Sequence, residues 1–112
     1  MISQGEVWWA DLPAPTGSGP GFRRPVVVVQ GDAFNRSTLG TVVCVPITGN
    51  LRWAEAPGNV RLTARSGLSR DSVANVSQVV ALDKTLLTER FGKLSRQKTE
   101  LVLAGLDVVL GR

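Results

Sequence analysis

The chain of 112 residues contains no histidine and a single cysteine. The lack of histidine removes the commonest zinc ligand, the usual general base and every nucleophile that needs a histidine partner. The one cysteine, Cys44, cannot form a disulfide within the chain, and its valine neighbours in the run 42–45 predict a buried side chain. Any catalytic chemistry must therefore depend on other side chains.

Long apolar runs are also missing. No segment approaches the roughly 20 apolar residues of a membrane-spanning helix, and residues 1–10 lack the basic start and apolar run of a signal peptide. The length and the 43% hydrophobic content suit one domain over residues 1–112. We therefore expect a single cytoplasmic domain that does not contact a membrane.

The charge is positive, with 13 Lys and Arg against 9 Asp and Glu, and arginine far outnumbers lysine. The planar fork of arginine suits phosphate. Between residues 52 and 70 the chain carries one glutamate and four arginines, namely Arg52, Arg61, Arg65 and Arg70. This pattern predicts a basic strip suited to a polyanion, although a merely soluble basic surface explains it equally well.

Clusters of β-branched and aromatic residues predict a mainly β fold. The expected strands lie at residues 5–12, 24–30, 41–48 and 60–64. Pro46 predicts that the third of these strands is an edge strand or carries a bulge. Segment 72–81 fits helical spacing about as well as strand alternation, and its valine richness favours a strand.

The end of the chain predicts a helix that begins after Ser95 and stops at Gly111. We expect this helix to pack on the sheet through a wide apolar arc. The arc comprises Leu101, Ala104, Leu106, Val108, Val109 and Leu110. Strands followed by one late helix indicate a compact barrel or a curled sheet.

Two local features bear on binding. Trp8 and Trp9 are adjacent in a predicted strand and must face opposite ways, so one is expected in the core. The other is either an anchor for a protein partner, which we favour, or a stacking platform for a base. Segment 13–21 holds three prolines and three glycines and predicts a loop, without the spacing of a phosphate-binding P-loop.

The chain shows no pair of carboxylates at a useful spacing, so glycosidase-like chemistry is unsupported. Arginines beside hydroxyl groups remain, and such a set stabilises a pentacovalent phosphorus although it accepts protons poorly. RNA supplies its own nucleophile, the 2′-hydroxyl. An enzyme that cleaves RNA therefore needs mainly to align the sugar and phosphate and to neutralise developing charge.

A series of short motifs runs through nearly the whole chain. In order they are GEVWWADL at 5–12, GS at 17–18, RPVVV at 24–28, VPIT at 45–48, RDSV at 70–73, Gln78 and LDK at 82–84. Each motif is weak alone. In their order and spacing the chain resembles the MazF/PemK family of toxin endoribonucleases from bacterial toxin–antitoxin pairs.

The resemblance implies an SH3-like barrel of the CcdB/MazF type with a C-terminal helix, a homodimer and a cognate acidic antitoxin. It implies cleavage of single-stranded RNA at short sequences without metal or cofactor, which inhibits translation and growth. The expected products are a 2′,3′-cyclic phosphate and a 5′-hydroxyl.

Carried over residue by residue, the resemblance places the catalytic arginine at Arg24 and the catalytic threonine at Thr48. The arginine would stabilise the phosphorane, and the threonine would hold the phosphate or the 2′-hydroxyl. Without the resemblance, these two would be ordinary strand-end residues. The expected RNA contacts are Ser18, Arg23, Trp53, Arg70 and Gln78, and the loops at 13–21 and around Trp53 are expected to set the sequence that is cut.

One departure concerns the proton acceptor. Some family members carry a glutamate directly after the Gly-Ser of the loop, and this chain has Gly19 there. Arg24 stays protonated and Thr48 is a weak base, so the group that takes the proton from the 2′-hydroxyl is left open.

Two other functions compete with this interpretation. A CcdB-type gyrase poison shares the fold, but such proteins rely on a C-terminal tip with tryptophan, whereas this chain ends in Val-Leu-Gly-Arg at 109–112. A noncatalytic RNA-binding barrel would be distinguished by the absence of any cleavage.

Overall fold

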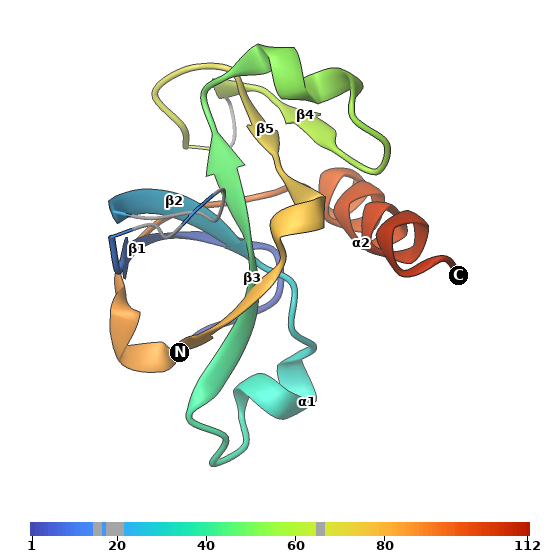
Figure 1. The fold of residues 1–112 in the computed structure, drawn as a ribbon. Coiled ribbons are helices and arrows are strands. Elements are labelled where there is room, and N and C mark those ends of the chain that lie inside the picture. The colour runs from blue at the N-terminus through green and yellow to red at the C-terminus, as the bar shows by residue number, and fades with distance from the viewer. Residues whose placement is uncertain (15–16, 18–21, 65–66) are drawn as a thin grey trace.

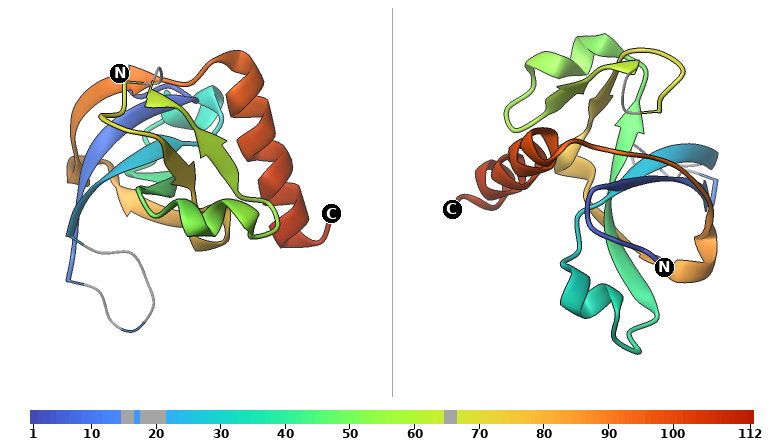
Figure 2. Two further views of the ribbon diagram at one scale, coloured as in Figure 1. Left: turned by 90° about the horizontal axis from the view of Figure 1, so that it is seen from above. Right: turned by 180° about the vertical axis from the view of Figure 1, so that it is seen from behind.

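The computed structural model describes residues 1–14, 17, 22–64 and 67–112. Within them a seven-stranded sheet has the order β4-β5-β3-β2-β1-β7, with β6 paired to one end of β3. The sheet bends into half of a barrel, and a long C-terminal helix packs beside it (Figures 1 and 2). The mainly β fold with a closing helix is therefore confirmed.

All strand pairs in the described part of the chain are antiparallel. The strands are β1 (Glu6–Leu12), β2 (Phe22–Val28), β3 (Thr41–Thr48), β4 (Val60–Leu62), β5 (Ser72–Ala74), β6 (Val80–Asp83) and β7 (Leu87–Lys93). The helices are α1 (Asp32–Asn35) and α2 (Arg96–Leu110), with 3-10 turns η1 (Leu51–Glu55), η3 (Val76–Gln78) and η4 (Lys84–Leu86).

Two differences from the expected strands stand out. Segment 72–81 is neither one strand nor a helix, because the turn η3 divides it into β5 and β6, which pair with different parts of β3. Strand β7 was not predicted from the sequence at all. Its residues are mostly polar and exposed, and its pairing with β1 carries two register shifts, so no clean alternation marks it.

The core lies on both faces of the sheet. Val27 and Val29 of the valine run contact a cluster that includes Val102 of α2, whereas Val26 and Val28 contact a second cluster around Cys44. This double burial is what four consecutive valines predict, since successive side chains of a strand alternate between faces. The prediction for Cys44 is also confirmed: it is fully buried, and this desolvation raises the pKa of its thiol to about 12.

Pro46 lies in a central strand, so the expected edge position is wrong. β3 pairs with β2 on one side, and on the other side its partner changes from β6, up to Cys44, to β5, from Ile47. Pro46 occupies the change of partner, where its carbonyl accepts a hydrogen bond from the Asn75 N–H at 2.9 Å. A residue without an N–H is tolerated there because the ladder is already interrupted.

Helix α2 has the expected ends. The Ser95 side chain accepts a hydrogen bond from the Lys98 N–H, and Gly111 ends the helix in a left-handed conformation. The expected buried arc is wrong, however, because most of its residues are exposed. The helix instead buries Val102 and Gly105, and a Cβ at Gly105 would press on the backbone of Gly58.

Candidate active site

Arg24 and Thr48 lie at the same end of two adjacent strands. β2 and β3 pair with Val26 opposite Pro46, and two residues further along each strand come Arg24 and Thr48. The antiparallel register therefore opposes them, and the alternation of side chains puts both on the face of Val26 and Pro46. Both are half-buried. The structure thus brings the two predicted catalytic residues together.

The Thr48 hydroxyl has a defined orientation. Its oxygen accepts a hydrogen bond from the Asn50 N–H at 3.2 Å, in the turn that follows β3. That bond uses one lone pair and leaves the O–H proton available as a donor. The turn after β3 thus holds the Thr48 oxygen in place. The hydroxyl can then donate a hydrogen bond to a ligand that lies beside Arg24.

Arg23 contacts a different surface from Arg24, because consecutive residues of a strand point to opposite faces. Its guanidinium lies 4.5 Å from the ring centroid of Trp9, and its Nε is 3.8 Å from Oδ1 of Asp11. Trp8 and Trp9 also face opposite ways, as expected. Trp8 packs against the core cluster around Cys44, as one of the two was expected to do, although both side chains stay half-buried.

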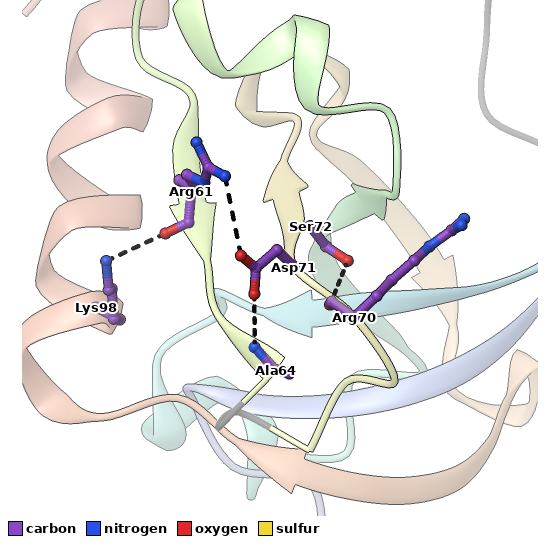
Figure 3. A network of polar contacts seen from close by, with 6 residues as sticks. All are labelled: Arg61, Ala64, Arg70, Asp71, Ser72 and Lys98. Carbon is purple, nitrogen blue, oxygen red and sulfur yellow. Dashed lines mark hydrogen bonds and ion pairs between the residues drawn. The ribbon is translucent and has the colours of Figure 1, made fainter.

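Arg70 approaches the predicted catalytic pair from the loop between β4 and β5. A Cβ at Gly49, the residue after Thr48, would lie 2.7 Å from Nε of Arg70, so the guanidinium rests on the bare glycine. Figure 3 shows that the Arg70 side chain extends away from Arg61 and Asp71. A second cation is thus held next to Thr48.

Arg61 does not join Arg70 in one basic strip. In Figure 3 its guanidinium pairs with Asp71, with 3.8 Å between Nη2 and Oδ2, and its carbonyl accepts a hydrogen bond from Lys98 of α2. The opposite directions of Arg61 and Arg70 divide the predicted strip between two surfaces. Arg65 lies outside the described residues.

The remaining predicted RNA contacts are dispersed. Trp53 lies on η1 with 46% of its surface exposed, and the guanidinium of Arg52 lies 6.0 Å from its ring centroid. Gln78 is the half-buried last residue of η3, a turn that contacts β3 and α2. Ser18 and Gly19 lie outside the described residues.

A pocket of about 310 Å³ lies beside the predicted catalytic pair, with the flanking residues Pro25 and Gly49 in its lining. It is lined by Trp9, Pro25, Ile47, Gly49, Gly67, Leu68, Ser69, Arg70, Ser72 and Phe91. The rings of Trp9 and Phe91 stack, with centroids 5.1 Å apart. The sequence offered one of the two adjacent tryptophans, without deciding which, as a possible stacking residue, but it did not indicate Phe91, since no pattern marked β7 as a strand.

Residues 1–14, 17, 22–64 and 67–112 contain no cluster of three His, Cys, Asp or Glu side chains that would hold a metal ion. None of the helices that they form is both long and apolar enough to cross a membrane.

The geometry indicates which kind of ligand this candidate site suits. An arginine and a hydroxyl donor opposed on one face suit a tetrahedral anion, because they present charge and a directed hydrogen bond to its oxygens. The second cation at Gly49 extends this potential along the strand ends. The curved sheet and this cluster define a small β protein equipped to hold a phosphate group.

Comparison with known proteins identifies the family. The model of the PemK-like, MazF-like toxins of type II toxin–antitoxin systems matches residues 3–110, and the chain belongs to this family. It is 48% identical over 111 residues to Endoribonuclease MazF6 of Mycobacterium tuberculosis, covering 98% of this chain and 97% of that protein.

Solved structures agree with this assignment. MazF from Deinococcus radiodurans superposes with a TM-score of 0.83 at 25% identity, covering 99% of this chain and 97% of that one. A mycobacterial endoribonuclease in complex with its cognate antitoxin gives a TM-score of 0.79 at 24% identity, covering 99% and 96%. The expected MazF-type fold is therefore confirmed.

Proposed function

We propose that this toxin is an endoribonuclease that cleaves single-stranded RNA, with Arg24 and Thr48 holding the scissile phosphate. The proposal rests mainly on one observation: Arg24 on β2 and Thr48 on β3 lie opposite each other on one face of the sheet. Family membership supplies the substrate class, and the arginine–threonine pair supplies a suitable phosphate clamp.

The 2′-oxygen attacks the adjacent phosphorus, and the bond from phosphorus to the 5′-oxygen breaks. The 2′-hydroxyl loses its proton and the departing 5′-oxygen gains one, which gives a 2′,3′-cyclic phosphate and a 5′-hydroxyl. The permanent charge of Arg24 stabilises the nonbridging oxygens as negative charge builds on them. The Thr48 hydroxyl donates to the phosphate and fixes its orientation. DNA is not cut, because it lacks the 2′-hydroxyl.

The deciding experiment measures cleavage of a long single-stranded RNA by the purified protein in excess chelator. We expect cleavage at short recurrent sequences, with cyclic phosphate ends detected by mass spectrometry, because neither proposed role needs a metal. Arg24→Ala should abolish cleavage while leaving the fold intact. Arg36→Ala is the matched control, since Arg36 is an exposed arginine that follows α1, away from the candidate site (Figure 1).

Each alternative result has a definite meaning. A requirement for added divalent metal would overturn the mechanism, and full activity of Arg24→Ala would remove Arg24 from it. Binding of RNA without any cleavage would favour the noncatalytic RNA-binding barrel. The assay contains neither DNA nor gyrase. Cleavage of RNA in it would therefore also reject the CcdB-type function.

The same proposal includes two protein partners. An acidic antitoxin segment is expected to cover the cationic site in the cytoplasm, as the family description and the net charge of +4 support. A homodimer is supported by the exposed apolar residues of α2, which include Val108 and Leu110 at 56% and 64% exposure. Binding of a cognate antitoxin without loss of cleavage would contradict the blocking role, and a monomer at micromolar concentration would contradict the dimer.

A further inference from the structure

The pocket beside the catalytic pair lies on the other face of the same strand ends. Pro25 follows Arg24, and Gly49 follows Thr48, so the residues that flank the pair line the pocket. Gly49 carries no side chain, and the Arg70 guanidinium lies against it. The pocket therefore adjoins the strand ends that carry the predicted pair.

The walls of the pocket are aromatic and apolar. Trp9 and Phe91 form a stacked pair with an interplanar angle of 25°, and the Arg23 guanidinium over Trp9 restrains the indole further. Ile47 and Leu68 line it as well and are 2% and 7% exposed, so they are fixed by the core. Such walls suit a flat ligand with apolar faces.

The polar groups of the pocket are donors and hydroxyls. Among the described residues of its lining, Arg70, resting on Gly49, is the one charged side chain, Ser69 and Ser72 contribute hydroxyls, and none carries a carboxylate. The Ser72 hydroxyl donates to the Arg70 carbonyl at 3.1 Å, which leaves its oxygen able to accept. A guanidinium fork pairs with adjacent acceptors, as on the edge of a base.

We propose that this pocket binds the nucleobase next to the scissile phosphate, with the Trp9–Phe91 wall against the base and the Arg70 fork on its acceptor edge. The inference rests on the proposed function and extends it to a specificity pocket. The volume of about 310 Å³ is at the lower end of ligand pockets, which run from roughly 300 to 1,000 Å³, and suits one base. Unstacked bases bound between aromatic and arginine planes are the usual basis of sequence-specific RNA recognition.

The test combines enzyme variants with abasic substrates. An oligoribonucleotide with one mapped cut site is made as a series in which each position near the cut carries an abasic ribose in turn. Phe91→Leu removes the ring. Gly49→Ala is expected to displace the flexible end of Arg70, because the three atoms nearest to its Cβ all belong to the Arg70 guanidinium. Gly40→Ala is the matched control, since a Cβ there meets nothing within 4 Å.

One abasic position is expected to lower kcat/KM of the wild-type enzyme about five- to 150-fold, the range for one lost base stack. Phe91→Leu and Gly49→Ala should cause similar losses on the intact substrate and little further loss on that one abasic substrate. Gly40→Ala should match the wild type throughout. Gly49→Ala keeps the test valid if Phe91→Leu fails to fold.

Three results would overturn the inference. Equal losses by both variants on every substrate would mean a general electrostatic or structural effect. If both variants cleaved RNA as the wild type does but bound the antitoxin more weakly, the pocket would bind a side chain of the antitoxin and not a base. Failure of the wild type to cut the intact oligoribonucleotide would remove the proposed function and this pocket together, whereas the first two results leave RNA cleavage standing.

Discussion

Arg24 and Thr48 should behave as a coupled pair in a double-mutant cycle. The register of β2 and β3 opposes them on one face, and the proposed mechanism has both act on the same phosphate. The changes are Arg24→Ala and Thr48→Val, singly and together. Valine keeps the β-branched shape of threonine at the strand end and removes only the hydroxyl.

The expected magnitudes follow from this shared ligand. Loss of one preorganised donor costs about 2.7–4 kcal/mol of transition-state stabilisation, or 10²–10³ in kcat. Once one member is gone, the phosphate is no longer held in line, and loss of the other costs less. The double variant should therefore fall short of the summed losses by about 0.5–3 kcal/mol, the coupling typical of residues that share a partner.

Arg36 supplies the control cycle, because it is an exposed arginine that follows α1, away from the pair. Arg36→Ala and Thr48→Val should add to within about 0.3–0.5 kcal/mol. The assay is single-turnover cleavage of an oligoribonucleotide, with urea unfolding to confirm that each variant folds. If the losses of transition-state stabilisation from Arg24→Ala and Thr48→Val were strictly additive, the two residues would not act on one shared phosphate.

Two further predictions concern the fold. Gly105→Ala should lower the free energy of unfolding by about 1–3 kcal/mol, since its Cβ would press on the backbone of Gly58, whereas Gly40→Ala should change it by less than about 0.5 kcal/mol in urea titrations. Cys44 should resist alkylation at pH 8 in the folded protein and react once it is unfolded, because burial raises the pKa of its thiol to about 12. For the same reason, stability should fall as the pH rises above 9, the thiol's ordinary value, where only the unfolded thiol ionises. Fast alkylation of native protein would contradict the buried thiol.

Features with a strong local pattern were predictable. The valine run was expected to be buried on both faces, and strand β3 was expected at residues 41–48, where it lies. Ser95 and Gly111 marked the ends of α2 through capping chemistry that involves only near neighbours. The motifs around Arg24 and Thr48 likewise indicated the family, because each is a short run of consecutive residues.

Features that depend on distant segments were not predictable. Pro46 is tolerated in a central strand only because the partner of β3 changes there. Helix α2 buries the side on which Gly105 closely approaches the backbone of Gly58. The pattern of apolar residues along the helix does not indicate this contact. Phe91 lines the pocket from β7, a strand whose sequence shows no clear alternation of apolar and polar residues.

The sequence by itself determined which side chains are available for the proposed chemistry of this toxin: an arginine, a threonine and no histidine. Only the tertiary structure decided that Arg24 faces Thr48, that Arg23 turns away, and that Arg70 rests on Gly49. The physical reason is that side-chain identity and local periodicity are written along the chain. Strand register and close approach are instead set by packing between segments far apart in sequence.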